Sequence, residues 1–269
     1  MAVAAVVAGT AHAAEPADAW SRIDASRVCA VAALWRLGIG TERAPAEAIE
    51  TVVPMNVDGR AVWRITHTPL KTPENVRGGA AAGFDFFDLD RATLAPVQSE
   101  HRGQRPGGSV VVTWFDYRDS TRGVQRLDAD GTVAETTRLN AEHRLIADGP
   151  GGAVIDQAIE WADGLRLRGY RLDRWRGREQ ERLRQVDFTV TGRSSVAIGG
   201  RRFETFVVSE DPADASYRVI SQVTVERPHR SVHVRYYPAG AQDPVRVFVS
   251  EVAALMQDRS CQQFAPKGT

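Results

Sequence analysis

Three aspartates stand close together in the segment FDFFDLDRAT, residues 84–93, and paired carboxylates are the first chemistry that this sequence offers. On an extended strand Asp88 and Asp90 share a face, about 6.6 Å apart, which suits two catalytic carboxylates. Asp85 falls on the opposite face, because side chains alternate along a strand. Aspartates also cap the end of an ordinary hairpin. We interpret the cluster as a hairpin end and predict no catalytic residue, with a hydrolase using Asp88 and Asp90 as an alternative function.

An arginine-rich segment, residues 165–184, is the strongest charge cluster in the sequence. It has eight arginines against three acidic residues, a local charge of 8 − 3 = +5. Guanidinium groups bind phosphate and carboxylate through paired hydrogen bonds, so the segment could contact an anionic headgroup or an envelope partner. The candidate contacts are Arg166, Arg168, Arg171 and Arg174. The alternative is a solvated hairpin whose charges are partly paired among themselves.

Patterns for metal, cofactor or nucleophilic chemistry fail on inspection. His229 and His233 lie four residues apart, but the alternation around them predicts a strand, which would separate the two rings by roughly 13 Å, too far to share a zinc ion. Ser194 and Ser195 lack the flanking glycines of a nucleophile elbow. GGAAAG, residues 78–83, lacks the lysine of a phosphate loop. We therefore predict no metal and no cofactor.

The first fifty residues divide into two predicted segments. Residues 1–14 are signal-peptide-like: they form an apolar run with the A-x-A pattern Ala11-His12-Ala13, and the missing basic residues fit a truncated start. Residues 15–50 are predicted to be helical, because Val28, Ala32 and Trp35 recur at helical spacing. We expect a periplasmic or secreted protein, in a Gram-negative envelope.

Residues 51–269 are predicted to form a single β-rich domain of ten to twelve strands. The apolar period is two, and Asp58-Gly59 and Gly199-Gly200 are hairpin signals. One helix is predicted in mid-chain, over residues 153–162. Consecutive hairpins give an antiparallel meander, which must curl over something because each strand has one apolar face. The fold class is therefore mainly β: a curved antiparallel meander, a half-open barrel-like sheet, with an N-terminal helix and one mid-chain helix on its concave side.

A sheet of this shape leaves an apolar trough on its concave side, and large apolar troughs usually have an occupant. Aromatic residues of the predicted strands are the candidates to line it, although each could equally belong to the core: Trp63, Phe84, Phe86, Trp114, Phe188 and Phe206.

The net charge, the apolar stretches and the cysteines of the chain limit which partners and which compartment we expect. The chain has 34 basic and 34 acidic residues, hence a formal charge of zero, which argues against nucleic acid. No stretch after the N-terminus reaches the roughly 18 apolar residues that a membrane span needs. Cys29 and Cys261 are the two cysteines, and in an exported protein they are candidates for a disulfide; two unrelated buried thiols are the alternative.

Residues 55–250 resemble a bacterial family of exported β-rich domains of unknown function, similar in outline to the lipoprotein-localisation carriers. The resemblance depends on a D-x-x-T-x-x-P hairpin in shifted form, a V-x-I-G-G-x-x-F hairpin and a strand ending YYP, with the residues Asp90, Thr93, Pro96, Val196, Ile198, Gly199, Gly200 and Phe203. It implies a half-barrel wrapped around a helix, a non-catalytic carrier role, and a lipid or lipoprotein acyl chain as cargo. Membrane anchoring is not implied, because no lipidation cysteine is present.

Overall fold

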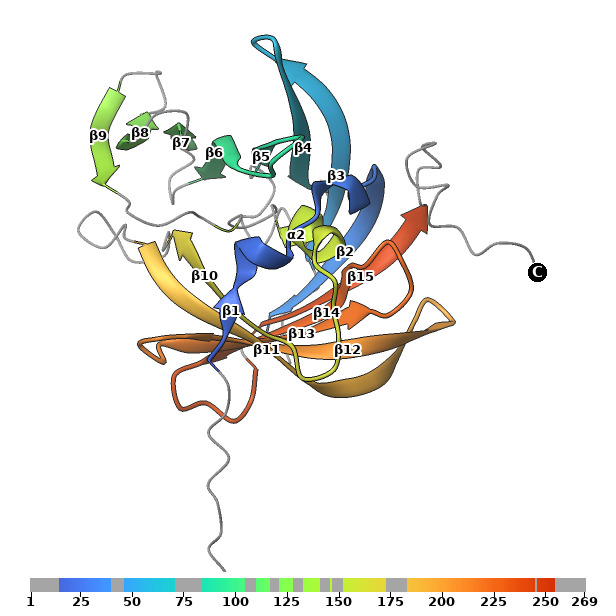
Figure 1. Cartoon of the computed structure of the whole chain (residues 1–269). Helices are drawn as coiled ribbons and strands as arrows, with labels where there is room; N and C mark the ends of the chain where they lie inside the picture. The colour runs from blue at the N-terminus through green and yellow to red at the C-terminus, as the bar shows by residue number, and fades with distance from the viewer. Residues whose placement is uncertain are drawn as a thin grey trace, which may run out of the picture.

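The computed structural model describes residues 15–39, 46–70, 84–104, 110–116, 121–127, 133–140, 146, 152–172, 183–244 and 246–254. In this part of the chain fifteen strands form one sheet around a short helix (Figure 1). The elements are β1 (Ala17–Asp18), β2 (Val31–Ile39), β3 (Ala46–Val57), β4 (Arg60–Pro69), β5 (Phe84–Asp90), β6 (Pro96–Gln104), β7 (Val110–Asp116), β8 (Thr121–Leu127), β9 (Val133–Asn140), α2 (Gly152–Ala158), β10 (Arg166–Leu172), β11 (Leu183–Ile198), β12 (Arg201–Pro212), β13 (Tyr217–Thr224), β14 (Ser231–Pro238) and β15 (Arg246–Ala254).

Two antiparallel meanders make up the sheet. Strands β2 to β9 pair in chain order, strands β10 to β15 do the same, and β15 pairs antiparallel with β2 to join the two. The short β1 lies parallel to β10 at one edge. The predicted antiparallel meander is confirmed, although the described residues contain more strands than the ten to twelve expected.

The predicted N-terminal helix is wrong. Two short 3-10 turns, Ala19–Arg22 and Ala25–Arg27, are followed by strands β2 and β3. The alanine-rich sequence suggested a helix, but β2 is a central strand that is hydrogen-bonded to β15 on one side and to β3 on the other. Sheet pairing on both edges outweighs a helix propensity of a few tenths of a kcal/mol per residue. The boundary expected at residue 51 falls inside β3.

The predicted hairpins have the backbone that their sequences require. Asp58 and Gly59 join β3 to β4 with φ values of 51° and 79°, and Gly199 and Gly200 join β11 to β12 with φ values of 56° and 80°. Two-residue turns with both φ angles positive match the twist of the flanking strands, which explains the Asp-Gly and Gly-Gly pairs. The predicted turn at Asp130-Gly131 lies outside the described residues.

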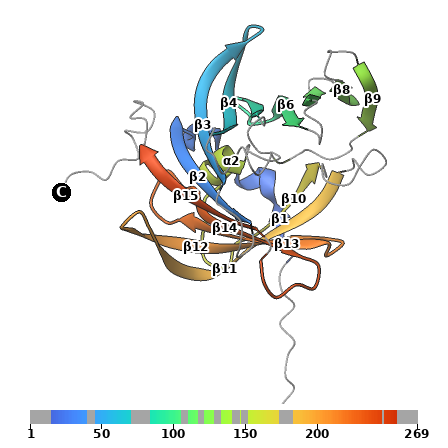
Figure 2. The ribbon, with the colours of Figure 1, turned by 180° about the vertical axis from the view of Figure 1, so that it is seen from behind.

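Helix α2 lies inside the curve of the sheet, as the views from both sides show (Figures 1 and 2). The predicted mid-chain helix is thus confirmed, in a shorter form. Its buried residues join the main hydrophobic core together with residues from both meanders, among them Trp63 and Ile65 of β4 and Phe188 of β11. Among the described residues, no helix has the length and apolar character that crossing a bilayer requires.

The N-terminal segment ties α2 in place. Asp24 donates its backbone N–H to the Ala158 carbonyl at 3.0 Å, and the backbone N–H of Cys29 donates to Oε1 of Gln157 at 2.9 Å. These contacts satisfy backbone groups that burial would otherwise leave unpaired. Cys29 is fully buried and engaged in a disulfide. Cys261 lies outside the described residues, so the Cys29–Cys261 pairing stays a prediction.

The contact between Gly169 of β10 and Ile146 allows a test of how tightly the residue before α2 packs on the sheet. The Gly169 hydrogen faces Ile146, which is 1% exposed, and a methyl group there would overlap the Ile146 side chain. We expect Gly169→Ala to lower the free energy of unfolding by about 1–3 kcal/mol, as overpacking does, in urea denaturation. Gly152→Ala is the control, because open space surrounds its added methyl and alanine favours a helix. Equal stability of the two variants would contradict this packing.

Candidate functional site

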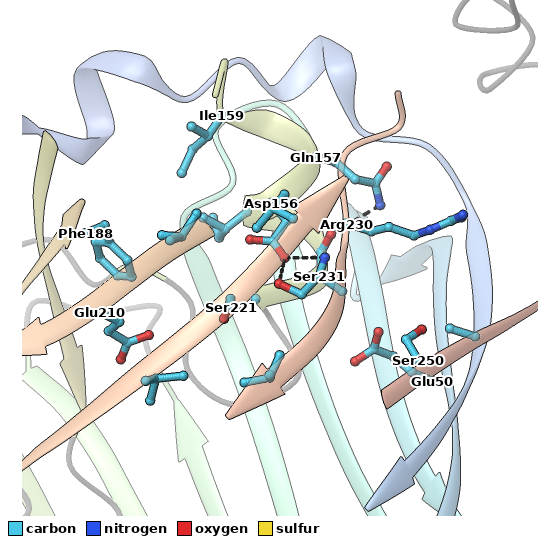
Figure 3. A pocket seen from close by; sticks show the side chains of 18 of the residues that line it. Glu50, Asp156, Gln157, Ile159, Phe188, Glu210, Ser221, Arg230, Ser231 and Ser250 are labelled. Carbon is cyan, nitrogen blue, oxygen red and sulfur yellow. Dashed lines mark hydrogen bonds between the residues drawn. The ribbon is translucent and has the colours of Figure 1, made fainter. Parts of the chain in front are cut away.

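A cavity of about 350 Å³ lies between α2 and the concave face of the sheet (Figure 3). Its walls come from α2, from β2 and β3, and from strands β10 to β15. Most of the lining is apolar, with Val31, Ile155, Phe188, Val208, Val219 and Val223 among its residues. The polar lining residues include Glu50, Asp156, Arg171, Glu210, Arg230 and Ser250.

Strand alternation explains how these side chains reach the cavity. On β13, Val219, Ser221 and Val223 face inward, as their spacing in the sequence predicts. On β12, Val208 and Glu210 are two residues apart, so they share a face, and both line the cavity. The carboxylate of Glu210 therefore occupies a position that the pattern of the strand assigns to the interior.

A bulge in β14 changes the expected face of one polar residue. Regular alternation would put Ser231 on the face of β14 that Val232 and Val234 do not share. The register of β13 and β14, however, shifts between Gln222 and Val223. After the shift Ser231 pairs with Val223 and lines the cavity together with Val234. A bulge inserts one residue and re-aims the side chains beyond it. Ser231 thereby faces α2.

Asp156 is the polar residue that α2 directs into the cavity. Its carboxylate accepts hydrogen bonds from the backbone N–H of Ser231 at 2.9 Å and from the Ser231 hydroxyl at 2.6 Å (Figure 3). Burial raises the pKa of Asp156, while the two bonds from Ser231 and the charge of Arg171 act in the opposite direction. The helix is thus joined to the bulge of β14 through a carboxylate that also faces the ligand space.

Glu50 of β3 is a second buried carboxylate in the wall. It is 9% exposed, and burial raises its pKa to about 7, with the Asp156 charge adding to the shift and the Trp35 indole opposing it. Among the described residues, no ion pair joins Glu50 to a cation. Near neutral pH this group can therefore either donate or accept a proton at the cavity wall.

Arg171 and Glu210 form an ion pair across the cavity wall. Arg171 Nη2 lies 3.1 Å from Glu210 Oε2, and the guanidinium stands 5.4 Å from the ring centroid of Phe188. Arg171 shares the inward face of β10 with the buried Leu167, because the two are four residues apart on a strand. The neighbouring arginines 166 and 168 fall on the other face.

Of the aromatic residues expected to line the trough, Phe188 lines this cavity. Trp63 and Phe206 are in the core, 2% and 3% exposed. Phe86 lies beneath the guanidinium of Arg64, with 4.4 Å from Cζ to the ring centroid. Phe84 and Trp114 lie on β5 and β7, and their side chains are outside the described part of the structure.

The candidate anion contacts do not form one patch in the described residues. Arg168 makes a bidentate pair with Asp187 on β11, with bonds of 2.8 and 3.0 Å, and Arg171 faces the cavity. Arg166 is on the outward face, and Arg174 lies outside the described residues. Arg168 and Arg171 are thus each paired with an acid outside the arginine-rich segment, Asp187 of β11 and Glu210 of β12.

Of the three aspartates, Asp90 lies at the turn between β5 and β6, whereas Asp85 and Asp88 pair with His101 and Gln98 within the ladder. Asp88 is fully buried and accepts from Arg64 Nε and Nη2, both at 2.7 Å, and from Gln98 Nε2 at 2.8 Å. Asp90 caps the turn by accepting from the Thr93 N–H at 2.9 Å and its hydroxyl at 3.0 Å. These contacts give both carboxylates a structural role.

The two histidines flanking the β14 bulge each bind a carbonyl or amide oxygen. Nδ1 of His229 lies 2.8 Å from the Thr224 carbonyl oxygen, and Nδ1 of His233 lies 2.7 Å from Oε1 of Gln222. Within the described residues, no group of three or more His, Cys, Asp or Glu side chains is arranged to hold a metal ion.

Sequence reasoning missed the carboxylates of the cavity. Glu50 follows Ala48 and precedes Val52 on the inward face of β3, and all three are buried. The signal was a carboxylate at an apolar position of an alternating strand, but it is readable only once residues 46–57 are taken as a strand. Asp156 was inside the predicted helix, and its partner Ser231 reaches it through a bulge that the alternation does not reveal.

The comparisons with known proteins add little to this picture. No protein-family model matches the sequence, and the curated proteins contain no match to it. Among solved structures, a DUF1329 family protein from Desulfovibrio piger is similar over 82% of each chain, with 8% sequence identity and a TM-score of 0.27. A likeness at that level carries no argument about function. The resemblance to the lipoprotein-localisation carriers stays a prediction.

Titration of Glu50 should be visible in the stability of the protein. Its folded pKa of about 7 lies above its ordinary value of 4.5. The folded state therefore holds more protons between those two values, and the free energy of unfolding falls as pH rises through them. At 1.36 kcal/mol per pKa unit the loss is about 3 kcal/mol. Glu50→Gln should gain about that much on wild type between pH 4 and pH 8, measured by urea denaturation.

Glu204→Gln is the matched control for this measurement, because Glu204 is an exposed carboxylate on β12. Its stability should follow that of the wild type within about 0.5 kcal/mol at both pH values. If Glu50→Gln shows the same pH dependence as wild type, Glu50 is not buried as described.

Proposed function

We propose that this protein binds a single-chain apolar or amphipathic ligand in the cavity between α2 and the sheet, without catalysis. The observation that supports this is the cavity itself: about 350 Å³ of space inside the fold, walled mainly by aliphatic and aromatic side chains with a few polar groups. Well-packed interiors leave few voids larger than a water molecule. Apolar pockets with a few convergent polar groups are the usual form of a ligand site.

The size of the cavity limits the occupant. Ligand pockets span roughly 300–1,000 Å³, and this cavity is at the lower end of that range. One acyl or alkyl chain fits such a volume better than a lipid with two or more chains. The acyl chain of a lipid or of a lipoprotein is thus the proposed cargo, and mass spectrometry of an organic extract of the purified native protein identifies it.

Filling the cavity should abolish binding. Ser221 lies between two valines on the cavity face of β13, so Ser221→Phe places a ring in the ligand space. In calorimetric titrations with 1-decanol we expect at least tenfold weaker binding than wild type. Ser195→Phe, at an exposed position of β11, should bind 1-decanol as wild type does. Undiminished binding by a folded Ser221→Phe variant, judged by its thermal unfolding, would place the ligand elsewhere.

We also propose that the protein acts in an oxidising compartment, the periplasm or the extracellular space. The signal-peptide-like segment supports export, and the disulfide at Cys29 fits such a compartment, since thiols stay reduced in the cytosol.

The two cysteines test this proposal. Proteolysis without reductant should release one disulfide-linked peptide pair that contains Cys29 and Cys261. Reduction should lower the free energy of unfolding by about 4–5 kcal/mol, because the bridge closes a long loop of the unfolded chain. Two alkylatable thiols in the protein isolated from its native source would refute the pairing.

A further inference from the structure

The polar groups of the cavity wall have unequal charge. Glu50, Asp156 and Glu210 are three carboxylates, and Arg171 and Arg230 are two guanidinium groups. If each cation neutralised one carboxylate, a single carboxylate would be left over. The contacts in the structure leave more negative charge than that.

Arg171 is already matched, because its ion pair with Glu210 spans 3.1 Å. Arg230 lines the cavity with its stem, and its guanidinium stands 5.7 Å from the ring of Phe203, a residue of the separate cluster with Ile198 and Val232. In Figure 3 the Arg230 side chain extends away from Asp156. Neither guanidinium is therefore placed to neutralise Glu50.

Two carboxylates thus face the ligand space without an ion pair of their own among the described residues. Asp156 accepts two hydrogen bonds from Ser231, a neutral residue. Glu50 is 9% exposed and has no cation beside it. Burying a carboxylate without a cation is unfavourable by several kcal/mol, which a bound cation would offset.

Ser250 gives an independent sign of a missing polar group. It lines the cavity from β15, is 1% exposed, and its hydroxyl has no hydrogen-bond partner among the described residues. β15 is next to β2, and β2 is next to β3, which carries Glu50. An unpaired buried hydroxyl costs roughly 1–3 kcal/mol. A ligand donor at this end of the cavity could bond both Glu50 and Ser250.

We infer that the end of the cavity where Glu50 and Ser250 lie side by side (Figure 3) binds the protonated amine of a single-chain amphiphile, with the charge of Asp156 adding to the negative potential there. This inference rests on the proposed function, because it assumes that the alkyl chain lies against the apolar wall. An ammonium group carries one positive charge and several donors, which match the Glu50 carboxylate and the Ser250 hydroxyl. A metal ion fits less well, because six or more oxygen ligands surround a hard cation.

The experiment compares three probes with the same ten-carbon chain: decylamine, 1-decanol and decanoate, each titrated into the full-length protein at pH 8 by calorimetry. A primary amine of this kind, like that of lysine with a pKa near 10.4, is charged at pH 8. We expect decylamine to bind at least tenfold more tightly than 1-decanol, and decanoate to bind most weakly. Equal affinity for amine and alcohol would overturn the inference but leave the proposed function intact.

Absence of binding by all three probes would instead overturn the proposed function. Tighter binding of decanoate than of decylamine would overturn the inference in favour of recognition by Arg171 or Arg230. The three outcomes are distinguishable because chain length is constant and only the headgroup changes.

Variants locate the headgroup. Glu50→Gln should reduce the preference for amine over alcohol at least fivefold, and Ser250→Ala should reduce it less, because it removes a neutral acceptor. Glu204→Gln, on the exposed face of β12, should keep the wild-type preference. A full preference retained in Glu50→Gln would show that the amine lies elsewhere.

The pH dependence of binding provides a readout that a merely structural role of Glu50 would not change. The other titratable groups that line the cavity are Asp156 of α2, Arg171 of β10, Glu210 of β12, and Arg230 and Tyr236 of the β14 region. At low pH a protonated Glu50 must lose its proton before it can pair with an ammonium. Decylamine affinity should therefore fall at least fivefold from pH 8 to pH 5.5 in wild type, and fall less in Glu50→Gln. A pH-independent affinity in wild type would contradict the role of Glu50.

Discussion

The packing of α2 against the inner face of the sheet is the interaction on which the rest of this structure depends. A curved antiparallel sheet with one apolar face must cover that face, and here the cover is a helix of seven residues. Val154, Ile155 and Ala158 bury their side chains against both meanders. A helix so short cannot fill the concavity, and the space that remains beside it is the cavity.

The contacts of the N-terminal segment with α2 also explain why this segment is not a helix. Its backbone groups are needed elsewhere: Asp24 and Cys29 donate to α2, and the residues that follow become β2. In that position β2 pairs with β15, and this pairing joins the two meanders into one sheet. Residues from both ends of the chain thus surround a helix from its middle, which makes the cavity a product of the whole fold.

The polar groups of the wall show how the cavity differs from ordinary core. A core of this size could have been closed with aliphatic side chains, and carboxylates in it are destabilising unless they are paired. Asp88 shows the paired case, with Arg64 and Gln98 around it. Glu50 shows the other, a buried carboxylate whose pKa burial raises to about 7. This contrast between the two carboxylates separates a structural site from a candidate binding site.

The sequence by itself determined the parts of the fold that depend on neighbouring residues. Alternation along β4 and β11 to β14 and the turns at Asp58-Gly59 and Gly199-Gly200 are local properties, because side-chain period and backbone angles are set within a few residues. Tertiary structure decided the rest. β2 is a strand because β3 and β15 pair with it, Ser231 faces inward because of a bulge, and Glu50 and Asp156 share a cavity because distant segments converge on α2. None of these contacts lies within the sequence range over which local patterns act.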